Sequence, residues 1–456
     1  MNRSTRRHMD TALERVPEMQ RFYTVAELDA SSEELVRQHP DIVRLVRIGE
    51  STDGHPIRML RIGTGPKQLL FIGCPYPNQP IGAMALEALS ELLVHDEELR
   101  GTAYTWNLIK CIDPDGTRLN EGWFDGPFTV THCATHYFRP GNASLAESTF
   151  PVDFKTYSFF SPLDETKALM AVITGIRPRF VYSLHNTGVG GGYFYLSPHR
   201  AGLETDLRRL LTDRGVPLSL GEPEMPWAVR LSPAIYRSPT LQDQYEFLAE
   251  QQYPDPAAML NRGNNTYAFS KSVCDSAHLM CDIPHFFDPR TANVTQAGQD
   301  KTRRDAILDG LDRVQPLVDL LGDVVRRVGP RMARRTRLRD GFFEIAPMLA
   351  QNTAMRRRWA LDTPGLDTPA TVAQTFDTRL CLPTHRLMFL GMAKRALEEQ
   401  LMSSEDEKIR QALAEVDESF STWSQKLETE LDYQAIPIRD LVQIQLGAAF
   451  HCIDRL

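Results

Sequence analysis

Several features that define other classes of protein are missing from this sequence of 456 residues. No apolar run reaches the roughly 20 residues that a membrane-spanning helix requires. The first residues, MNRSTRRHMDTALERVPEMQ, are charged and lack the apolar segment of a secretory signal. The seven cysteines are scattered and odd in number, which is typical of reduced thiols rather than of a disulfide framework. These absences predict a cytoplasmic protein that has no contact with the membrane.

An excess of positive charge is also missing. The formal net charge is −8, which argues against a general nucleic-acid-binding protein. Apolar residues make up 42% of the chain and charged residues 24%, both ordinary for a globular protein with a sizeable core. The length predicts two or three domains, although a large α/β fold can take up about 300 residues by itself.

The first 300 residues alternate between strand-like and helix-like patterns. Amphipathic helices are predicted over 24–40, 82–94 and 164–176 from their apolar spacing. Apolar or alternating runs predict strands in the segments 41–51, 57–63, 68–73, 105–112 and 179–185. This alternation predicts an α/β fold with a largely parallel sheet that is covered by helices on both faces.

The pattern changes after residue 300. Residues 302–328 read as one long helix, and seven arginines then lie between Arg326 and Arg339, a run that we interpret as a solvated linker. Strand signals vanish from about residue 340 onward. We therefore predict an α/β domain over 1–325, a basic linker over 326–339 and an all-helical domain over 340–456.

One C-terminal helix carries a heptad pattern. Ser404 is its predicted N-cap, and the apolar positions that repeat at steps of four and three are Ile409, Leu413, Val416, Phe420, Trp423 and Leu427. Such a seam is buried either inside a small bundle, which we favour, or in a dimer. A protein partner or self-association through these helices is therefore a second functional possibility.

Four motifs, in the same order, resemble the M14 family of zinc carboxypeptidases over about residues 20–320. They are YTVAELDASSEELVRQHPDIVRLVRIGESTDGHPIRMLRIG, DPDG at 113–116, RPRFVYSLHNTG and HLMCDIP. The resemblance implies a carboxypeptidase-like α/β sandwich around a mixed, mostly parallel sheet. It also implies that His185, at the end of RPRFVYSLH, takes the place of the third zinc ligand of the family.

The resemblance fails at the other two zinc ligands. The loop IGCPYPNQPIG, residues 72–82, is similar to the family pattern Gly-x-x-His-x-x-Glu-Pro-x-Gly, but Tyr76 and Gln79 stand at the His and Glu positions. A neutral phenol and an uncharged amide are poor zinc donors, and a catalytic site typically needs three protein ligands. His185 alone is not sufficient, so we expect no zinc cofactor unless other residues supply ligands.

The resemblance also implies roles for other residues. Asp282 takes the place of the catalytic glutamate, and Tyr267 matches the pocket tyrosine. Arg139 matches the arginine that grips the substrate carboxylate as a bidentate fork, and Arg118 the arginine after the DPDG turn. The expected substrate-binding set is completed by Asn186, Tyr76 and Gln79.

Three other groupings are open. His132 and His136 lie four residues apart and can form a rearranged zinc site with His185, although two histidines in a loop are the simpler interpretation. Cys74 can act as a nucleophile with a histidine base, although a small buried thiol is favoured. Buried positions on a strand are also favoured for the set Cys274, His278, Cys281 and His285.

The function predicted from these residues is binding of the carboxylate end of a peptide or amino-acid conjugate, with Arg139 as the anchor and zinc hydrolysis lost or repurposed. One alternative is an active zinc metallocarboxypeptidase with rearranged ligands. The other is an assembly subunit that acts through its helical C-terminal domain. Whether the protein is an enzyme is therefore open.

Overall fold

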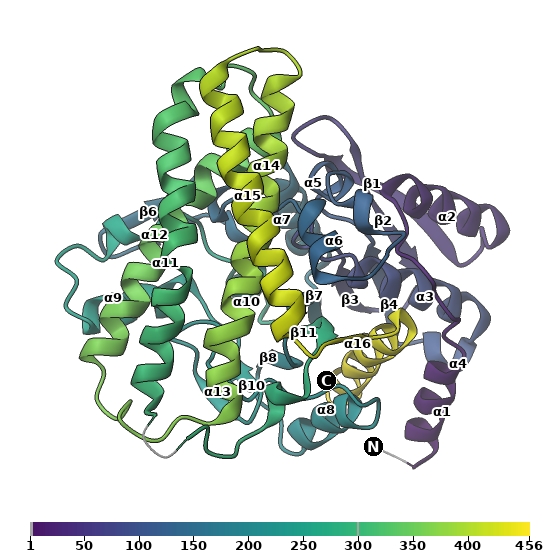
Figure 1. The fold of residues 1–456 in the computed structure, drawn as a ribbon. Helices are drawn as coiled ribbons and strands as arrows, with labels where there is room; N and C mark the ends of the chain where they lie inside the picture. The colour runs from purple at the N-terminus through teal and green to yellow at the C-terminus, as the bar shows by residue number, and fades with distance from the viewer. Residues whose placement is uncertain (1–2, 299–300) are drawn as a thin grey trace.

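The computed structural model describes residues 3–298 and 301–456 and is built around a mixed sheet of ten strands (Figure 1). The strands are β1 (Val43–Glu50), β2 (Pro56–Ile62), β3 (Lys67–Ile72), β4 (Tyr104–Ile109), β7 (Phe180–Val189), β8 (Tyr193–Ser197), β9 (Arg230–Ser232), β10 (Ile235–Arg237), β11 (Ala277–Phe287) and β12 (Gln434–Ala435). A separate hairpin consists of β5 (Val152–Phe154) and β6 (Tyr157–Phe159).

Helices surround the sheet. Those of the first 300 residues are α1 (Arg3–Glu14), α2 (Val25–Gln38), α3 (Ile81–His95), α4 (Glu97–Arg100), α5 (Pro114–Arg118), α6 (Val130–Thr135), α7 (Asp164–Ile176), α8 (Leu203–Thr212), α9 (Leu241–Glu250) and α10 (Thr266–Cys274). Those that follow are α11 (Arg303–Val328), α12 (Arg337–Asp362), α13 (Val372–Phe376), α14 (Leu382–Leu401), α15 (Glu407–Glu430) and α16 (Ile438–Ile453). Among the described residues, none of these helices has the length and apolarity that crossing a lipid bilayer requires.

The centre of the sheet is parallel and its flanks are antiparallel. Strands β4, β3, β7 and β11 lie side by side and run in the same direction, whereas β1, β2 and β8 join through antiparallel pairs. The predicted mixed, mostly parallel sheet is thereby confirmed. Because the parallel strands end at one edge, the residues at their carboxyl ends are brought together.

Alternate residues of the central strands enter different cores, as the period of two requires. Phe71 and Leu184 point into the large cluster shared with α3, whereas Leu70 and Val181 point into a second cluster against α7. Burial on both faces explains why these strands read as continuous apolar runs.

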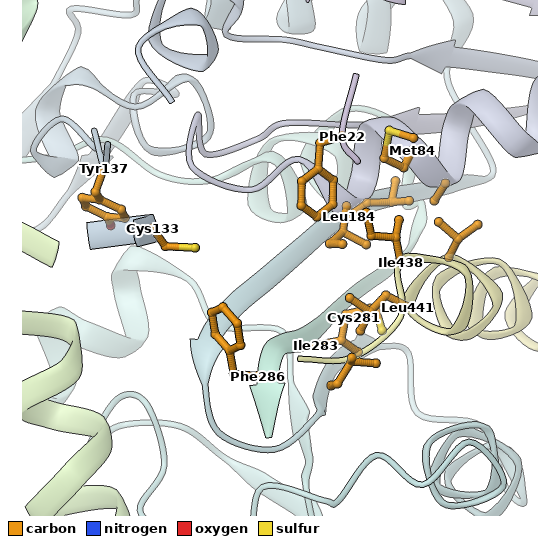
Figure 2. Packing of buried hydrophobic residues seen from close by; sticks show 14 of the residues in the cluster. Phe22, Met84, Cys133, Tyr137, Leu184, Cys281, Ile283, Phe286, Ile438 and Leu441 are labelled. Atoms are coloured by element: carbon orange, nitrogen blue, oxygen red, sulfur yellow. The ribbon is translucent and has the colours of Figure 1, made fainter. Parts of the chain in front are cut away.

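The C-terminal helix α16 returns to the sheet and packs in the large cluster (Figures 1 and 2). Ile438 and Leu441 of α16 lie beside Cys281 of β11 in Figure 2. The Gln445 side chain donates hydrogen bonds to the backbone oxygens of His185 and Cys281, at 2.6 and 3.1 Å. Side chains from before and after the predicted linker at 326–339 therefore share one core. The division into two domains stays a prediction.

The arginine-rich stretch contains more helix than a linker would. It comprises the end of α11, a turn at Gly329–Arg331 and the start of α12. Arg337 forms ion pairs with Asp53 and Asp115, at 2.5 and 2.6 Å, and so connects α12 to the N-terminal half of the chain. At least this arginine is a structural contact rather than a solvated charge.

The heptad seam lies on α15, whose N-cap is Asp406 rather than the predicted Ser404. The Asp406 carboxylate accepts from the backbone N–H groups of Lys408 and Ile409, and a carboxylate is a strong capping group. The buried residues of α15 are Ile409, Ala412, Val416, Phe420, Ser424 and Leu427, whereas Leu413 and Trp423 are half-buried. The heptad seam is therefore packed inside a helical bundle, where α15 lies mainly against α14.

Two aromatic residues of α15 allow a test of this packing. Phe420 is 6% exposed, so Phe420→Ala should lower the free energy of unfolding by about 3–5 kcal/mol. Trp423 rests against the cationic groups of Arg313 and Lys426 at the edge of the bundle, so Trp423→Ala should lower it by only about 1–2 kcal/mol. Urea unfolding of both variants checks the order, and an equal or larger loss for Trp423→Ala would contradict this packing.

Candidate functional site

His185 and Asp282 are neighbours at the carboxyl ends of two central strands. They form a register pair between β7 and β11, so their side chains leave the sheet on the same face. Both are buried, at 2% and 6% exposure. Their juxtaposition follows from the parallel pairing of β7 with β11, because His185 and Asp282 are 97 positions apart in the sequence.

Glu147 contacts the imidazole of His185. The sequence patterns did not indicate a role for this glutamate. It lies in a short turn, Ala146–Ser148, and its Oε2 is 3.2 Å from His185 Nε2. Its Oε1 accepts hydrogen bonds from Ser183 and Thr266, at 2.5 and 2.7 Å. Burial raises the pKa of Glu147, but these hydrogen bonds and the charge of His185 outweigh it, so the net pKa is lowered. The group is therefore an ionised carboxylate that fixes the orientation of the imidazole.

Glu147→Gln should lower the free energy of unfolding by about 1.5–3 kcal/mol at pH 7, because charge-assisted hydrogen bonds are lost. A carboxyl whose pKa is lowered by folding stabilises the protein above its unfolded pKa, about 4.3, and loses this effect as the pH falls through the folded pKa. The difference in unfolding free energy between Glu147→Gln and the parent should therefore shrink below about pH 4. Urea unfolding of both proteins, at pH 7 and below about pH 4, measures this difference. Glu415→Gln, at an exposed ion pair, is the control and should change stability by less than about 0.5 kcal/mol.

Tyr76 joins His185 to Arg139. The Tyr76 ring meets the His185 ring edge-to-face, with centroids 5.0 Å apart, and the Arg139 guanidinium lies 4.8 Å from the Tyr76 centroid. Burial raises the pKa of the Tyr76 phenol, although the charges of Arg139 and Arg262 act in the opposite direction. The phenol is thus neutral, and the structure brings together three residues that the resemblance had assigned to one site.

Gln79 and Asn186 connect the loop before α3 to β7. Gln79 Nε2 donates to the backbone oxygen of Asn186 at 2.6 Å, and Asn186 Oδ1 accepts from the Ile81 N–H at 3.3 Å. Asn186 Nδ2 lies 2.6 Å from Nε2 of His285, whose pKa burial lowers to about 3, so that this neutral ring accepts. These bonds are internal to the protein, and a role in substrate binding stays a prediction for both residues.

Asp282 has one oxygen free of hydrogen bonds. Its Oδ2 accepts from the Tyr193 hydroxyl at 3.0 Å, whereas Oδ1 is buried without a partner among the described residues. Burial raises the pKa of Asp282 to about 7 against the opposing charge of His185, and Glu224 raises it further. A carboxyl with a raised pKa and a free oxygen is chemically suited to donate or accept a proton.

Two other predicted site residues contact other histidines. Tyr267, on α10, packs at a tilt against His278 with ring centroids 5.2 Å apart. Arg118 is exposed and its guanidinium lies 2.8 Å from His55 Nδ1, in a cleft of about 500 Å³ that none of the residues around His185 lines. The structure therefore does not bring Arg118 to His185.

The alternative metal and nucleophile sites also separate in space. His132 and His136 lie in and just after α6 and contact each other, with ring centroids 4.8 Å apart. Cys74 packs with Leu28 and Ala83 in a small apolar cluster. His278, Cys281 and His285 are on β11, as the strand interpretation predicted, and Cys274 ends α10. Within residues 3–298 and 301–456, no three His, Cys, Asp or Glu side chains are arranged to hold a metal ion.

The residues at the three positions that the resemblance assigns to zinc do not fit the ion. Gln79 uses its amide nitrogen to hold the backbone of Asn186, and Tyr76 presents a neutral phenol. Imidazole, thiolate and carboxylate are the usual protein donors for zinc, and His185 is the only one of these three residues that offers one.

Residues 28–127 match the family model of zinc carboxypeptidases, peptidase M14. The chain has an M14 carboxypeptidase-like fold. The matched segment of this carboxypeptidase-like protein includes Tyr76 and Gln79 and ends before Arg139, His185 and Asp282. A comparison with curated proteins finds no significant match.

Several solved structures are similar to this carboxypeptidase-like chain. Carboxypeptidase A from Helicoverpa armigera is 12% identical, with 62% of this chain and 71% of that one covered and a TM-score of 0.39. Bovine thrombin-activatable fibrinolysis inhibitor, in complex with tick carboxypeptidase inhibitor, is 13% identical, with 57% and 86% covered and a TM-score of 0.35. A metallo-carboxypeptidase from Burkholderia cenocepacia is 12% identical, with 57% and 60% covered and a TM-score of 0.35.

Proposed function

We propose that this protein binds the carboxylate end of a peptide or amino-acid conjugate at Arg139 and does not carry out the zinc-dependent hydrolysis of the M14 family. The proposal rests on the contacts of the Arg139 side chain. Its guanidinium rests on Tyr76 and donates only to neutral oxygens, those of Pro140 at 3.3 Å and Asn142 at 3.2 Å. No carboxylate of the described residues forms an ion pair with it, so its charge is available to a ligand.

The loop that carries Arg139 is held in place from the other half of the chain. Glu344 of α12 accepts from the Gly141 N–H at 3.0 Å and from the Ser144 hydroxyl at 2.7 Å. Gly341 of the same helix packs so closely on Phe138 that an added Cβ would lie 3.1 Å from its ring. A guanidinium on a supported loop loses less conformational freedom on binding, which favours its use as an anchor.

The rest of the site supports binding rather than hydrolysis through zinc. The one imidazole at the family's ligand positions is already held by Glu147, and its two companions are a phenol and an amide. Without zinc no bound water is made acidic near pH 7. The proposal also includes a cytoplasmic location, which the sequence predicts.

Binding of matched peptides tests this function. N-acetyl-Ala-Ala with a free carboxylate should bind the purified full chain, and the same peptide with a C-terminal amide should bind at least about tenfold more weakly. Isothermal titration calorimetry measures both affinities. Equal affinities, or no binding of either peptide, would contradict the proposed function.

A further inference from the structure

Asp282 is the middle member of a row of polar side chains that crosses three strands. His185 of β7 and Tyr193 of β8 are its register partners on either side. Paired residues of adjacent strands point to the same face of a sheet, so these three side chains lie together on one face. Because the Tyr76 ring contacts that of His185 and the Arg139 guanidinium rests on the Tyr76 ring, the row begins at a cationic group.

The other end of the row is acidic. The Tyr193 hydroxyl lies 3.0 Å from Oδ2 of Asp282 and 3.3 Å from Oε2 of Glu224, and the Tyr195 hydroxyl also lies 3.3 Å from this Glu224 oxygen. The one hydrogen of the Tyr193 hydroxyl can serve only one of the two carboxylates at a time. Oδ1 of Asp282 is buried and has no partner among the described residues. The two carboxylates therefore have more acceptor capacity than the tyrosines can fill.

Neither carboxylate forms an ion pair in the part of the chain that the structure describes. Arg356 contacts Glu224 only through its backbone oxygen, at 2.6 Å, and Arg262 donates to the Gln244 side chain at 2.9 Å. A buried carboxylate without a cationic partner destabilises a folded chain. The unfilled acceptor atoms of Asp282 and Glu224 therefore point to a ligand group that carries a positive charge and several hydrogen-bond donors.

Tyrosine rings lie beside these carboxylates. The Tyr195 ring is 5.8 Å from that of Tyr193 and 5.4 Å from that of Tyr236, measured between centroids. Tyr195 and Tyr236 are buried, whereas Tyr193 is half-buried and Glu224 is exposed, so a ligand can approach from the side of Glu224. Aromatic rings attract ammonium groups, and carboxylates accept their hydrogens. This environment suits an ammonium and repels an anion.

We infer that the ligand is dipolar and that its ammonium group binds between Asp282 and Glu224, beside Tyr193. The inference rests on the proposed function, in which Arg139 holds the carboxylate of the same ligand. The two ends of the row then match the two charges of the ligand. An ammonium can come from the free α-amino group of a short peptide or from the side chain of a lysine.

Two pairs of peptides test the inference by isothermal titration calorimetry on the full chain. Ala-Ala-Ala is compared with N-acetyl-Ala-Ala-Ala, and N-acetyl-Ala-Lys with the same peptide acetylated on the lysine side chain. Within each pair one acetyl group removes the positive charge. In at least one pair the peptide with the ammonium should bind about tenfold more tightly or better, and that pair identifies the source of the ammonium. Equal affinities within both pairs would overturn the inference.

Variants show whether the two carboxylates cause this preference for the ammonium. Glu224→Gln removes an exposed charge and Asp282→Asn a buried one, and each should lower the preference at least about threefold. Glu415→Gln removes an equal charge from α15, where the side chain is 46% exposed, and should leave the preference unchanged. This control separates the local effect from the attraction of a chain with a net charge of −8. An unchanged preference in Glu224→Gln would overturn the inference, whether or not Asp282→Asn folds.

The outcomes also separate this inference from the proposed function. If N-acetyl-Ala-Ala binds more tightly than its C-terminal amide but the ammonium has no effect in either pair, Arg139 binds carboxylates and only the ammonium site is wrong. If acid and amide bind equally well, the proposed function fails, and the dipolar ligand fails with it.

Discussion

Arg139→Gln should weaken the binding of a peptide with a free carboxylate by about 2–5 kcal/mol, the usual effect of removing one partner of a buried charge pair. Arg139→Lys should not restore binding. An ammonium keeps the charge but loses the planar fork that matches a carboxylate, and it loses the flat contact with the Tyr76 ring, which lies 4.8 Å from the guanidinium carbon.

His185→Ala should weaken binding by only about 1 kcal/mol, because without zinc the imidazole offers the ligand at most one hydrogen bond. Isothermal titration calorimetry on both variants shows whether Arg139 or His185 contributes more to binding. Arg118→Gln is the matched control, since the structure places this arginine beside His55 in another cleft and its loss should have no effect. A larger loss for His185→Ala than for Arg139→Gln would overturn the non-zinc interpretation.

The second large effect concerns metal binding. Tyr76→His combined with Gln79→Glu should raise zinc affinity by at least about 100-fold, because the loss of a supporting residue alone changes it by 10- to 100-fold and here two direct ligands are added. The positions suit a three-ligand site. The Tyr76 ring lies 5.0 Å from that of His185, and Gln79 already touches the backbone of the next residue, Asn186. Glu147 holds Nε2 of His185 and leaves Nδ1 for a metal.

Competition with a chelator of known affinity measures zinc binding in the parent, in each single variant and in the double variant. The zinc affinity of each single variant should lie between that of the parent and that of the double variant. Equal zinc affinity in parent and double variant would show that the site is wrongly placed. One tightly bound zinc per chain in the parent, purified without added metal, would favour a metallocarboxypeptidase with rearranged ligands.

Much of the fold could be predicted because local sequence patterns specify it. The buried strands β3, β4 and β7 were visible as apolar runs, α3 as an amphipathic segment and α11 as one long helix, within a few residues of their observed ends. Strand β11 was indicated only by the family resemblance of HLMCDIP. The N-cap of α15 was misplaced by two residues, because Ser404 and Asp406 are both good capping residues and local sequence does not choose between them.

The candidate site could be predicted only in part. The motifs placed His185 and Asp282 at the ends of strands, and the loop 72–82 showed that two zinc donors are replaced. Glu147 carried no signal, because it is a single glutamate in an irregular segment, 38 residues before its partner His185.

The sequence by itself determined the main helices, the central strands and the chemistry present in the loop before α3, since each depends on residues that are near one another in the chain. Tertiary structure decided which side chains share a site, because burial and hydrogen bonding depend on segments that are distant in sequence. It alone joined Arg139 to Tyr76, set Gln445 of the last helix under His185, and moved Arg118 to another cleft.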